Sequence, residues 1–290
     1  MSHSPGRTVP RVAFQGELGA FSEEAVHRFF EDQAEPVPRR DFPEVGRAVT
    51  EGEVDFGVLP IENSLAGSVV GSYDVLAEGE LEIVGEVITP IHHCILGLPG
   101  AKLDQVKRIR SHPVALMQCT RVLRVLTGAE AVAVYDTAGA AKEVADLQDP
   151  TQAAIAGRRA AARYGLEILA EDIEDRADNQ TRFLVVRSRA SAPAEPVFGS
   201  ATRPPTKTAV LVETQNVPGA LLRVLSPFSD RKINLSKLES RPAGEPWTYR
   251  FFIELDAPAE DPAAAEALQE VRVRSVRLQV LGSYPRWHAG

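Results

Sequence analysis

The chain has 290 residues, of which 44% are hydrophobic and 25% are charged, and its formal net charge is -8. This composition is typical of a globular protein with two or three compact units, and an acidic chain without long Lys or Arg blocks argues against a nucleic-acid or anionic-membrane surface. Because no apolar run approaches the roughly 20 residues of a membrane span and the N-terminus has no signal-peptide pattern, we expect a cytoplasmic protein.

Short apolar runs and amphipathic runs follow one another through the first part of the chain. The apolar runs RVAFQG and VDFGVLP have strand character, whereas AFSEEAVHRFF, FPEVGRAVTEG and SVVGSYDVLAEG are amphipathic. This order predicts an α/β architecture with mostly parallel strands.

The run from residue 81 to 98 is too long for one strand and contains Pro90, which cannot donate to a sheet ladder. We interpret it as a crossover into a second α/β lobe, and the strand DNQTRFLVV as a return to the first lobe. The predicted domain is 8–188, with one lobe at 8–88 plus 178–188 and the other at 89–177. Two lobes joined by two crossings enclose a cleft, where ligands commonly bind.

A Pro-, Ala- and Ser-rich segment at 189–206 is typical of an interdomain linker. After it, residues 207–285 show the order strand, helix, strand, strand, helix, strand, which predicts a βαββαβ unit. Pro218 suits the first turn of the first helix of this unit, and PAGEP suits a hairpin between its middle strands.

Polar side chains follow several predicted strands in the first domain. They are Asn63 and Ser64 in LPIENSLAGS, Ser111 and Gln118 in SHPVALMQC, and Thr137 in YDTAGAAKEV. Ligands of open α/β sheets gather beyond the carboxyl ends of strands, although helix capping is an alternative role for such residues. The Gly-rich turn QGELGAFSEEA could hold an anion at a helix start, or Ser22 could simply cap that helix.

The strand DNQTRFLVV opens with a hydroxyl and a cation. Alternate side chains of a strand share a face, so Thr181 and Phe183 should point one way and Arg182 the other. A turn built by Asn179 and Thr181, with a solvated Arg182, is the structural alternative.

His92, His93 and Cys94 raise the possibility of a metal site. Adjacent strand residues face opposite sides, and no second Cys/His pair lies at a finger-like spacing, so we predict no metal. The sequence also lacks the dinucleotide fingerprint and the phosphate loop, and we predict no cofactor. With only Cys119 in addition, the chain also lacks a disulfide framework.

The motifs QGELGAFSE, PIENS, SHPVALMQC, DTAGAAKEV and the Thr-Arg-Phe triplet, in this order, resemble prephenate dehydratase. The segment GALLRVLSPFSDRKINLSKLESRP resembles the ACT regulatory domain that follows it. The resemblance runs from about residue 12 to residue 284. It implies a catalytic domain resembling type 2 periplasmic binding proteins, with the active site in the cleft, followed by a ferredoxin-like ACT domain that senses phenylalanine.

The resemblance implies a reaction in which prephenate loses carbon dioxide and hydroxide together to give phenylpyruvate. We expect Thr181 to be the catalytic residue, donating a hydrogen bond to the leaving hydroxyl. The residues expected to bind the substrate are Asn63, Ser64, Ser111, Gln118, Thr137, Arg182 and Phe183. Glu62 is expected to brace its loop.

The ACT resemblance implies L-phenylalanine as an allosteric effector, bound where two such domains meet, and therefore a homodimer or homotetramer. The expected effector-binding residues are Gly219, Ala220, Leu221, Glu239, Ser240 and Arg241. A domain that only dimerises is the alternative.

Two other functions remain open from the sequence. Ala20 stands where many family members have Thr, and several motifs are similar to those of plant-type arogenate dehydratases, so arogenate is an alternative substrate. A non-catalytic aromatic-acid binding protein is the second alternative. The first predicted strand begins near residue 10, which leaves no room for a chorismate mutase domain within this sequence.

Overall fold

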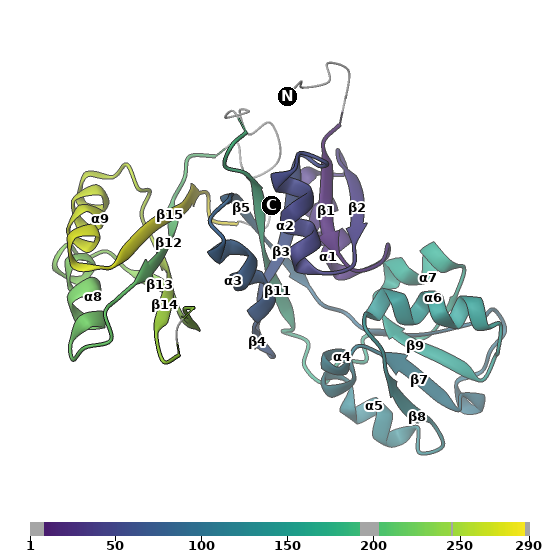
Figure 1. Ribbon diagram of the computed structural model, residues 1–290. Helices are drawn as coiled ribbons and strands as arrows, with labels where there is room; N and C mark the ends of the chain where they lie inside the picture. The colour runs from purple at the N-terminus through teal and green to yellow at the C-terminus, as the bar shows by residue number, and fades with distance from the viewer. Residues whose placement is uncertain (1–8, 192–202, 245, 288–290) are drawn as a thin grey trace.

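The structure is a computed structural model that describes residues 9–191, 203–244 and 246–287, and the described part contains three β-sheets (Figure 1). The predicted linker lies mostly outside the described residues. No described helix is long and apolar enough to cross a lipid bilayer.

The first sheet forms the centre of the molecule in Figure 1. Its strands are β1 (Arg11–Gln15), β2 (Glu35–Arg39), β3 (Phe56–Asn63), β4 (Gly67–Ser68), β5 (Leu81–Pro90) and β11 (Gln180–Ser188), and its helices are α1 (Phe21–Phe30), α2 (Phe42–Thr50) and α3 (Val70–Ala77). The strand order is β2-β1-β3-β11-β5, with β4 paired to β3. α1 begins at Phe21 with Ala20 at its N-cap, so the alternative in which Ser22 caps it is wrong.

The second sheet belongs to the teal lobe in Figure 1. Its strands are β6 (Cys94–Gly97), β7 (Arg108–Ser111), β8 (Glu130–Ala133), β9 (Gln152–Ala156) and β10 (Glu167–Ala170), in the order β10-β6-β9-β7-β8. Its helices are α4 (Pro113–Gln118), α5 (Thr120–Val125), α6 (Thr137–Leu147) and α7 (Arg158–Tyr164), with a 3-10 turn, η1 (Leu103–Gln105).

The chain crosses between the two lobes at 91–93 and again at 171–179, and β11 then inserts between β3 and β5. This confirms the two-lobed α/β fold. The expectation of mostly parallel strands is wrong, because the strands next to the crossings pair antiparallel: β11 with β3 and β5, and β6 with β9 and β10.

The C-terminal unit has the predicted βαββαβ order. Its elements are β12 (Lys207–Glu213), α8 (Ala220–Asp230), β13 (Leu235–Pro242), β14 (Tyr249–Leu255), α9 (Pro262–Arg274) and β15 (Arg277–Tyr284). α8 begins at Ala220 after a cap at Gly219, whose φ of 78° is favourable only for glycine, so Pro218 lies just before the helix and not in its first turn.

The antiparallel sheet of the C-terminal unit, β13-β14-β12-β15, is covered on both faces. Val210, Val212 and Ile253 pack against α8 and α9, which lie on the outer side in Figure 1. The opposite face contributes Leu211 and Phe252 to a buried cluster of the first lobe. The sheet is therefore fixed to the first lobe by apolar burial, the main favourable term in such packing.

Candidate active site

A ring of three side-chain amides lies at the point where the first lobe meets the crossings. Asn63 Nδ2 donates to Asn179 Oδ1 (2.8 Å), Asn179 Nδ2 donates to Gln118 Oε1 (2.9 Å), and Gln118 Nε2 donates to Asn63 Oδ1 (3.2 Å). The ring joins both lobes, because Gln118 ends α4 in the second lobe and Asn63 ends β3 in the first.

The hydroxyl of Thr181 is attached to this ring. Asn63 Nδ2 donates to Thr181 Oγ1 over 3.0 Å, and both residues are 9% exposed. A hydroxyl can accept this bond and still donate its own hydrogen elsewhere. The local arrangement thus presents a donor whose oxygen is held in place.

Strand register explains why Thr181 and Asn63 meet. They are directly paired across the antiparallel β11 and β3, and the pairing shifts between Arg182 and Phe183. Paired residues share a face of the sheet, and such irregularities are frequent next to active sites. Asn63 is held further by its Oδ1, which accepts from the main-chain amides of Leu65 and Ala66.

His93 borders the ring from the first crossing. Its Nε2 donates to Gln118 Oε1 (3.1 Å), and its ring meets Phe21 edge-on with 5.4 Å between centroids. Burial lowers the pKa of His93 below its ordinary value, and this effect is larger than the opposing effect of the hydrogen bond to Gln118. From the sequence pattern, His93 is a candidate metal ligand or a packed side chain, and Asn179 is a turn residue.

Ser64 braces the loop after β3. Its Oγ donates to the main-chain oxygen of Asp178 (3.1 Å) and accepts from the amide of Gln180 (3.0 Å). The loop that carries Asn63 is therefore tied to the start of β11.

The remaining residues expected near the substrate are not all in this group. Ser111 is fully buried and donates to the main-chain oxygen of Ile155 (2.6 Å), and Thr137 is the first residue of α6, which is capped by Asp136. No hydrogen bond within the described residues joins Ser111 or Thr137 to the amide ring. Phe183 is 2% exposed within the apolar core, which gives it a packing role.

Arg182 requires a correction. Its guanidinium lies on the opposite face of β11 from Thr181, as strand alternation predicts, and therefore away from the amide ring. Arg182 Nη1 lies 3.1 Å from Glu86 Oε2 and 2.8 Å from Glu254 Oε1. We accordingly assign Arg182 to an ion cluster and not to the substrate.

This ion cluster consists of Arg182, Lys207, Glu86 and Glu254, and it joins the first lobe to the C-terminal unit. Lys207 Nζ lies 3.1 Å from Glu86 Oε2 and 2.7 Å from Glu254 Oε2. Burial by itself would raise the pKa of Glu254, but the charges of Arg182 and Lys207 hold that pKa below its ordinary value. The two cations and two carboxylates balance, which is the condition for burying them together.

The β1–α1 loop connects the lobes on another side. A Cβ at Gly19 would come within 2.8 Å of Ala160 Cα, so only glycine permits this approach to α7. Glu17 accepts from Tyr135 Oη (3.0 Å), and its amide donates to Asp136 Oδ2 (3.3 Å). The Gly-rich turn thus serves contact between lobes.

Comparison with known proteins shows the family. The prephenate dehydratase family model matches residues 12–191, and the ACT domain model matches residues 208–273. The chain belongs to the prephenate dehydratase family.

Named relatives of this family carry two activities. Arogenate dehydratase 2 of Petunia hybrida is 42% identical over 95% of this chain and 71% of its own length. The bifunctional chorismate mutase/prephenate dehydratase of Stutzerimonas stutzeri is 41% identical over 95% of this chain and 73% of its own length.

Solved structures resemble the whole chain. The prephenate dehydratase of Arthrobacter aurescens in complex with L-Phe has a TM-score of 0.85 and 35% identity, covering 95% of this chain and 90% of that one. GqqA, described as a novel type of quorum quenching acylase, has a TM-score of 0.85 and 34% identity, covering 96% of this chain and 98% of that one.

The residues expected to bind an effector divide between two faces of the ACT domain. Ser240 is exposed on the face that carries α8, near whose start lie Gly219, Ala220 and Leu221. On the opposite face, Glu239 Oε2 accepts from Ser68 Oγ (2.6 Å), and Arg241 Nη2 lies 3.5 Å from Asp74 Oδ1. Glu239 and Arg241 therefore contact the catalytic domain.

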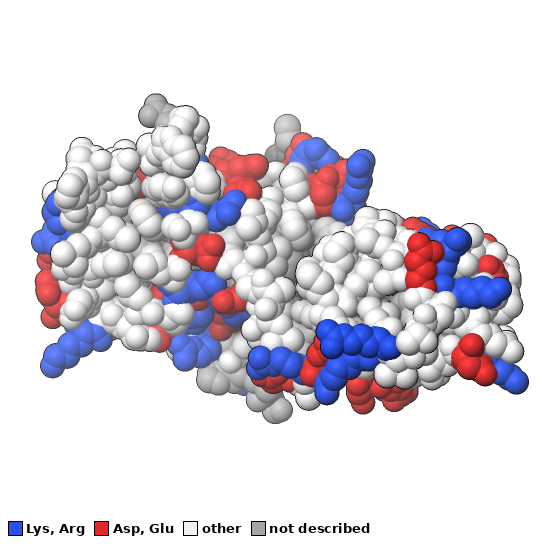
Figure 2. Space-filling model, turned by 90° about the horizontal axis from the view of Figure 1, so that it is seen from below, with Lys and Arg blue, Asp and Glu red and all other residues white. Residues whose placement is uncertain are grey.

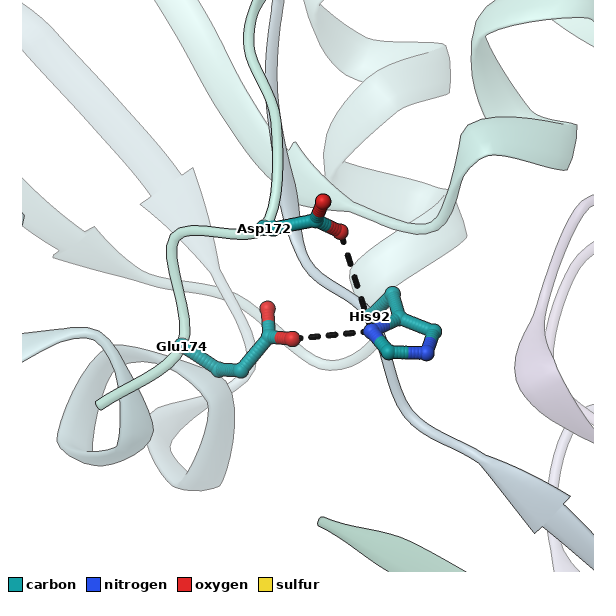
Figure 3. Close-up of side chains that lie close together, drawn as sticks. All are labelled: His92, Asp172 and Glu174. Carbon is teal, nitrogen blue, oxygen red and sulfur yellow. Dashed lines mark hydrogen bonds and ion pairs between the residues drawn. The ribbon is translucent and has the colours of Figure 1, made fainter. Parts of the chain in front are cut away.

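The two crossings of the dehydratase domain are joined by His92, Asp172 and Glu174 (Figure 3). His92 Nδ1 lies 2.9 Å from Glu174 Oε1 and 3.7 Å from Asp172 Oδ1. One ligand atom from each residue lies within 4.8 Å of the others, a set that could hold a metal ion. The hydrogen bond between His92 Nδ1 and Glu174 Oε1 already accounts for their proximity, so we interpret the arrangement as a link between the two crossings.

A cavity of about 400 Å³ lies beside His92. It is lined from α1, from the first crossing and from the start of α7, by Phe21, Glu24, His27, Arg28, Asp32, Pro90, His92, Arg158 and Arg159. On the face shown in Figure 2, Lys and Arg side chains are interspersed with Asp and Glu side chains, in keeping with the absence of a basic block in the sequence.

Proposed function

We propose that this chain is a cytoplasmic enzyme that converts prephenate to phenylpyruvate, carbon dioxide and water. The observation that carries the proposal is the Thr181 hydroxyl, whose oxygen accepts from Asn63 and whose hydrogen is donated to no group within the described residues. In the reaction the bond to the carboxylate breaks, its electron pair enters the ring, and the ring hydroxyl departs as hydroxide. A hydrogen bond from Thr181 to that oxygen stabilises the departing charge, and the hydroxide takes a proton from solvent to give water.

The neutral character of the amide ring supports this chemistry. Decarboxylation is slowed by a cation that stabilises the carboxylate before it leaves, and the guanidinium of Arg182 is turned away. Each amide NH2 has two hydrogens, and the bonds given above use one from Gln118 and one from Asn179. The remaining N–H groups are suited to orient the substrate.

Arogenate is the second candidate substrate, favoured by the names of the plant relatives. It carries an ammonium where prephenate has a keto group, and the dehydration at the ring is the same. Purified protein offered each substrate separately, with phenylpyruvate and phenylalanine quantified, distinguishes the two. If the protein converts neither prephenate nor arogenate, the enzymatic proposal is overturned and an aromatic-acid binding protein is favoured.

The acylase activity named for GqqA is less compatible with this site. A serine nucleophile needs a neighbouring base to take its proton. Ser64 and Ser111 instead donate to the main-chain oxygens of Asp178 and Ile155.

We further propose that L-phenylalanine inhibits the enzyme by binding near the start of α8, in a homodimer or homotetramer. Support comes from the complex of the Arthrobacter aurescens enzyme with L-Phe and from large apolar side chains that the single chain leaves exposed. Leu222 on α8 is 70% exposed and Val273 on α9 is 83% exposed. Sedimentation with and without phenylalanine tests the assembly, and a monomer under both conditions would contradict it.

A further inference from the structure

Asn63 of the amide ring and Thr181, which is attached to the ring, each have a charged neighbour on the opposite face of the sheet. Asn63 is preceded on β3 by Glu62, and Thr181 is followed on β11 by Arg182. Because side chains alternate along a strand, these two neighbours point to the face opposite the ring. Both of them end on side chains of the ACT domain.

The first connection runs from Glu62 to β13. Lys237 Nζ lies 2.8 Å from Glu62 Oε1 and 3.3 Å from Ser68 Oγ, and Ser68 also donates to Glu239. Glu62 and Ser68 bracket the loop that contains Asn63 and Ser64. Lys237 is 13% exposed, so its charge is largely removed from water and depends on these partners.

The second connection runs from Arg182 to β14 and β12. Glu254 contacts Arg182 at 2.8 Å and Lys207 at 2.7 Å, and its side chain is 8% exposed. Arg182 Nη2 also lies 3.6 Å from Glu62 Oε2, which links the two connections behind the ring.

We propose that Lys237 and Glu254 of the ACT domain are positioning residues for catalysis: through Glu62 and Arg182 they set the places of Asn63 and Thr181. A ligand near the start of α8 that displaces β13 moves Lys237 and thereby loosens the loop of Asn63. The proposal rests on the proposed function, and it gives the effector a physical route to the site. Because β3 and β11 are paired, with Thr181 opposite Asn63 and Arg182 opposite Glu62, both connections act on the same pair of strands.

The decisive variant is Lys237→Met, which keeps the aliphatic stem and removes the charge. We expect kcat to fall about tenfold with KM changed by less than about twofold, because misplaced catalytic groups slow the chemical step more than they weaken binding. Inhibition by phenylalanine should be weakened as well. Lys237→Arg should restore kcat, and Glu254→Gln should repeat the effect of Lys237→Met from the second connection.

Gln279→Ala is the matched control. Gln279 Nε2 donates to the main-chain oxygen of Gly79 (2.9 Å) across the same domain contact, and it lies on neither connection. This variant should keep the kcat and the phenylalanine response of the unmodified chain. An equal loss in Gln279→Ala would show that any weakening of domain contact suffices, and the proposal would be overturned.

Hydrogen exchange gives a readout that does not need turnover. Amides at 61–66 and 179–183 should exchange faster in Lys237→Met than in Gln279→Ala. If the unmodified chain converts neither prephenate nor arogenate, the proposed function fails, and exchange alone decides the coupling. Unchanged exchange in both Lys237→Met and Glu254→Gln would overturn the coupling whatever the activity.

Discussion

Asn63 and Thr181 are paired across β3 and β11, and the Nδ2 of Asn63 lies 3.0 Å from the Oγ1 of Thr181. Because the Thr181 oxygen accepts a hydrogen bond from Asn63, the hydrogen of the Thr181 hydroxyl points away from Asn63. In the proposed reaction that hydrogen meets the departing hydroxyl.

Asn63→Asp tests this relationship with almost no change in shape. The carboxylate still accepts the amides of Leu65 and Ala66, so the loop should stay in place. It cannot donate to Thr181, and it places a negative charge near the departing hydroxide, which that charge would destabilise. We expect kcat for prephenate to fall by at least about a hundredfold, with an unchanged circular dichroism spectrum. An activity close to that of the unmodified chain would remove Asn63 from the mechanism.

Arg182→Met tests the buried ion cluster. Glu86 and Glu254 would then share only Lys207, which leaves an uncompensated buried negative charge. We expect the midpoint of thermal unfolding to fall by about 5 °C. Arg158→Met is the control, since Arg158 is 62% exposed and its pair with Glu171 should contribute little. Equal midpoints for both variants would show that the cluster does not stabilise the fold.

The pH dependence of stability should reflect His93. Burial lowers its pKa in the folded chain below the ordinary value of 6.5. Between the lowered pKa and 6.5 the unfolded chain binds a proton that the folded chain does not, so stability is lost as the pH falls through this window. His93→Gln should show a smaller drop in unfolding midpoint between about pH 7.5 and about pH 5. An identical drop would assign the titration to other groups.

Gly219→Ala tests the start of α8. Gly219 has a φ of 78°, and an added Cβ would approach Arg223 Nη1 to 3.2 Å. We expect a loss of about 1 kcal/mol in stability and weaker binding of phenylalanine by calorimetry, because the helix start would shift to relieve the strain. Gly165→Ala, also at positive φ but with open space around the added Cβ, controls for strain alone. If both variants bind phenylalanine equally weakly, the effector does not bind at the start of α8.

Much of this arrangement follows from local sequence patterns. Alternation along DNQTRFLVV places Thr181 and Arg182 on opposite faces, and the βαββαβ order of the C-terminal unit is visible in its strand and helix signals. Local patterns could not predict the partners of Arg182, because Glu86 and Glu254 are 96 and 72 residues away in the sequence. Their meeting depends on how the ACT sheet docks on the first lobe, which no local pattern specifies.

The amide ring shows the same limit. Asn63 ends β3 in the first lobe and Gln118 ends α4 in the second, and the sequence indicates only that each lies shortly after or at the end of an apolar strand. Asn179 completes the ring only because β11 pairs with β3 in one particular register. In that register Thr181 meets Asn63, which is 118 residues away in the sequence. Sequence therefore identified Thr181 and Asn63 as candidates but could not predict their hydrogen bond.

The most direct test of the central claim compares prephenate turnover by the unmodified chain, Thr181→Ser and Thr181→Val, following phenylpyruvate and carbon dioxide together. Serine keeps the hydroxyl and valine keeps the shape. We predict stoichiometric formation of both products, substantial activity in Thr181→Ser, and a loss of at least about a hundredfold in Thr181→Val with a similar KM. Equal turnover by Thr181→Val and the unmodified chain would contradict the role assigned to the Thr181 hydroxyl.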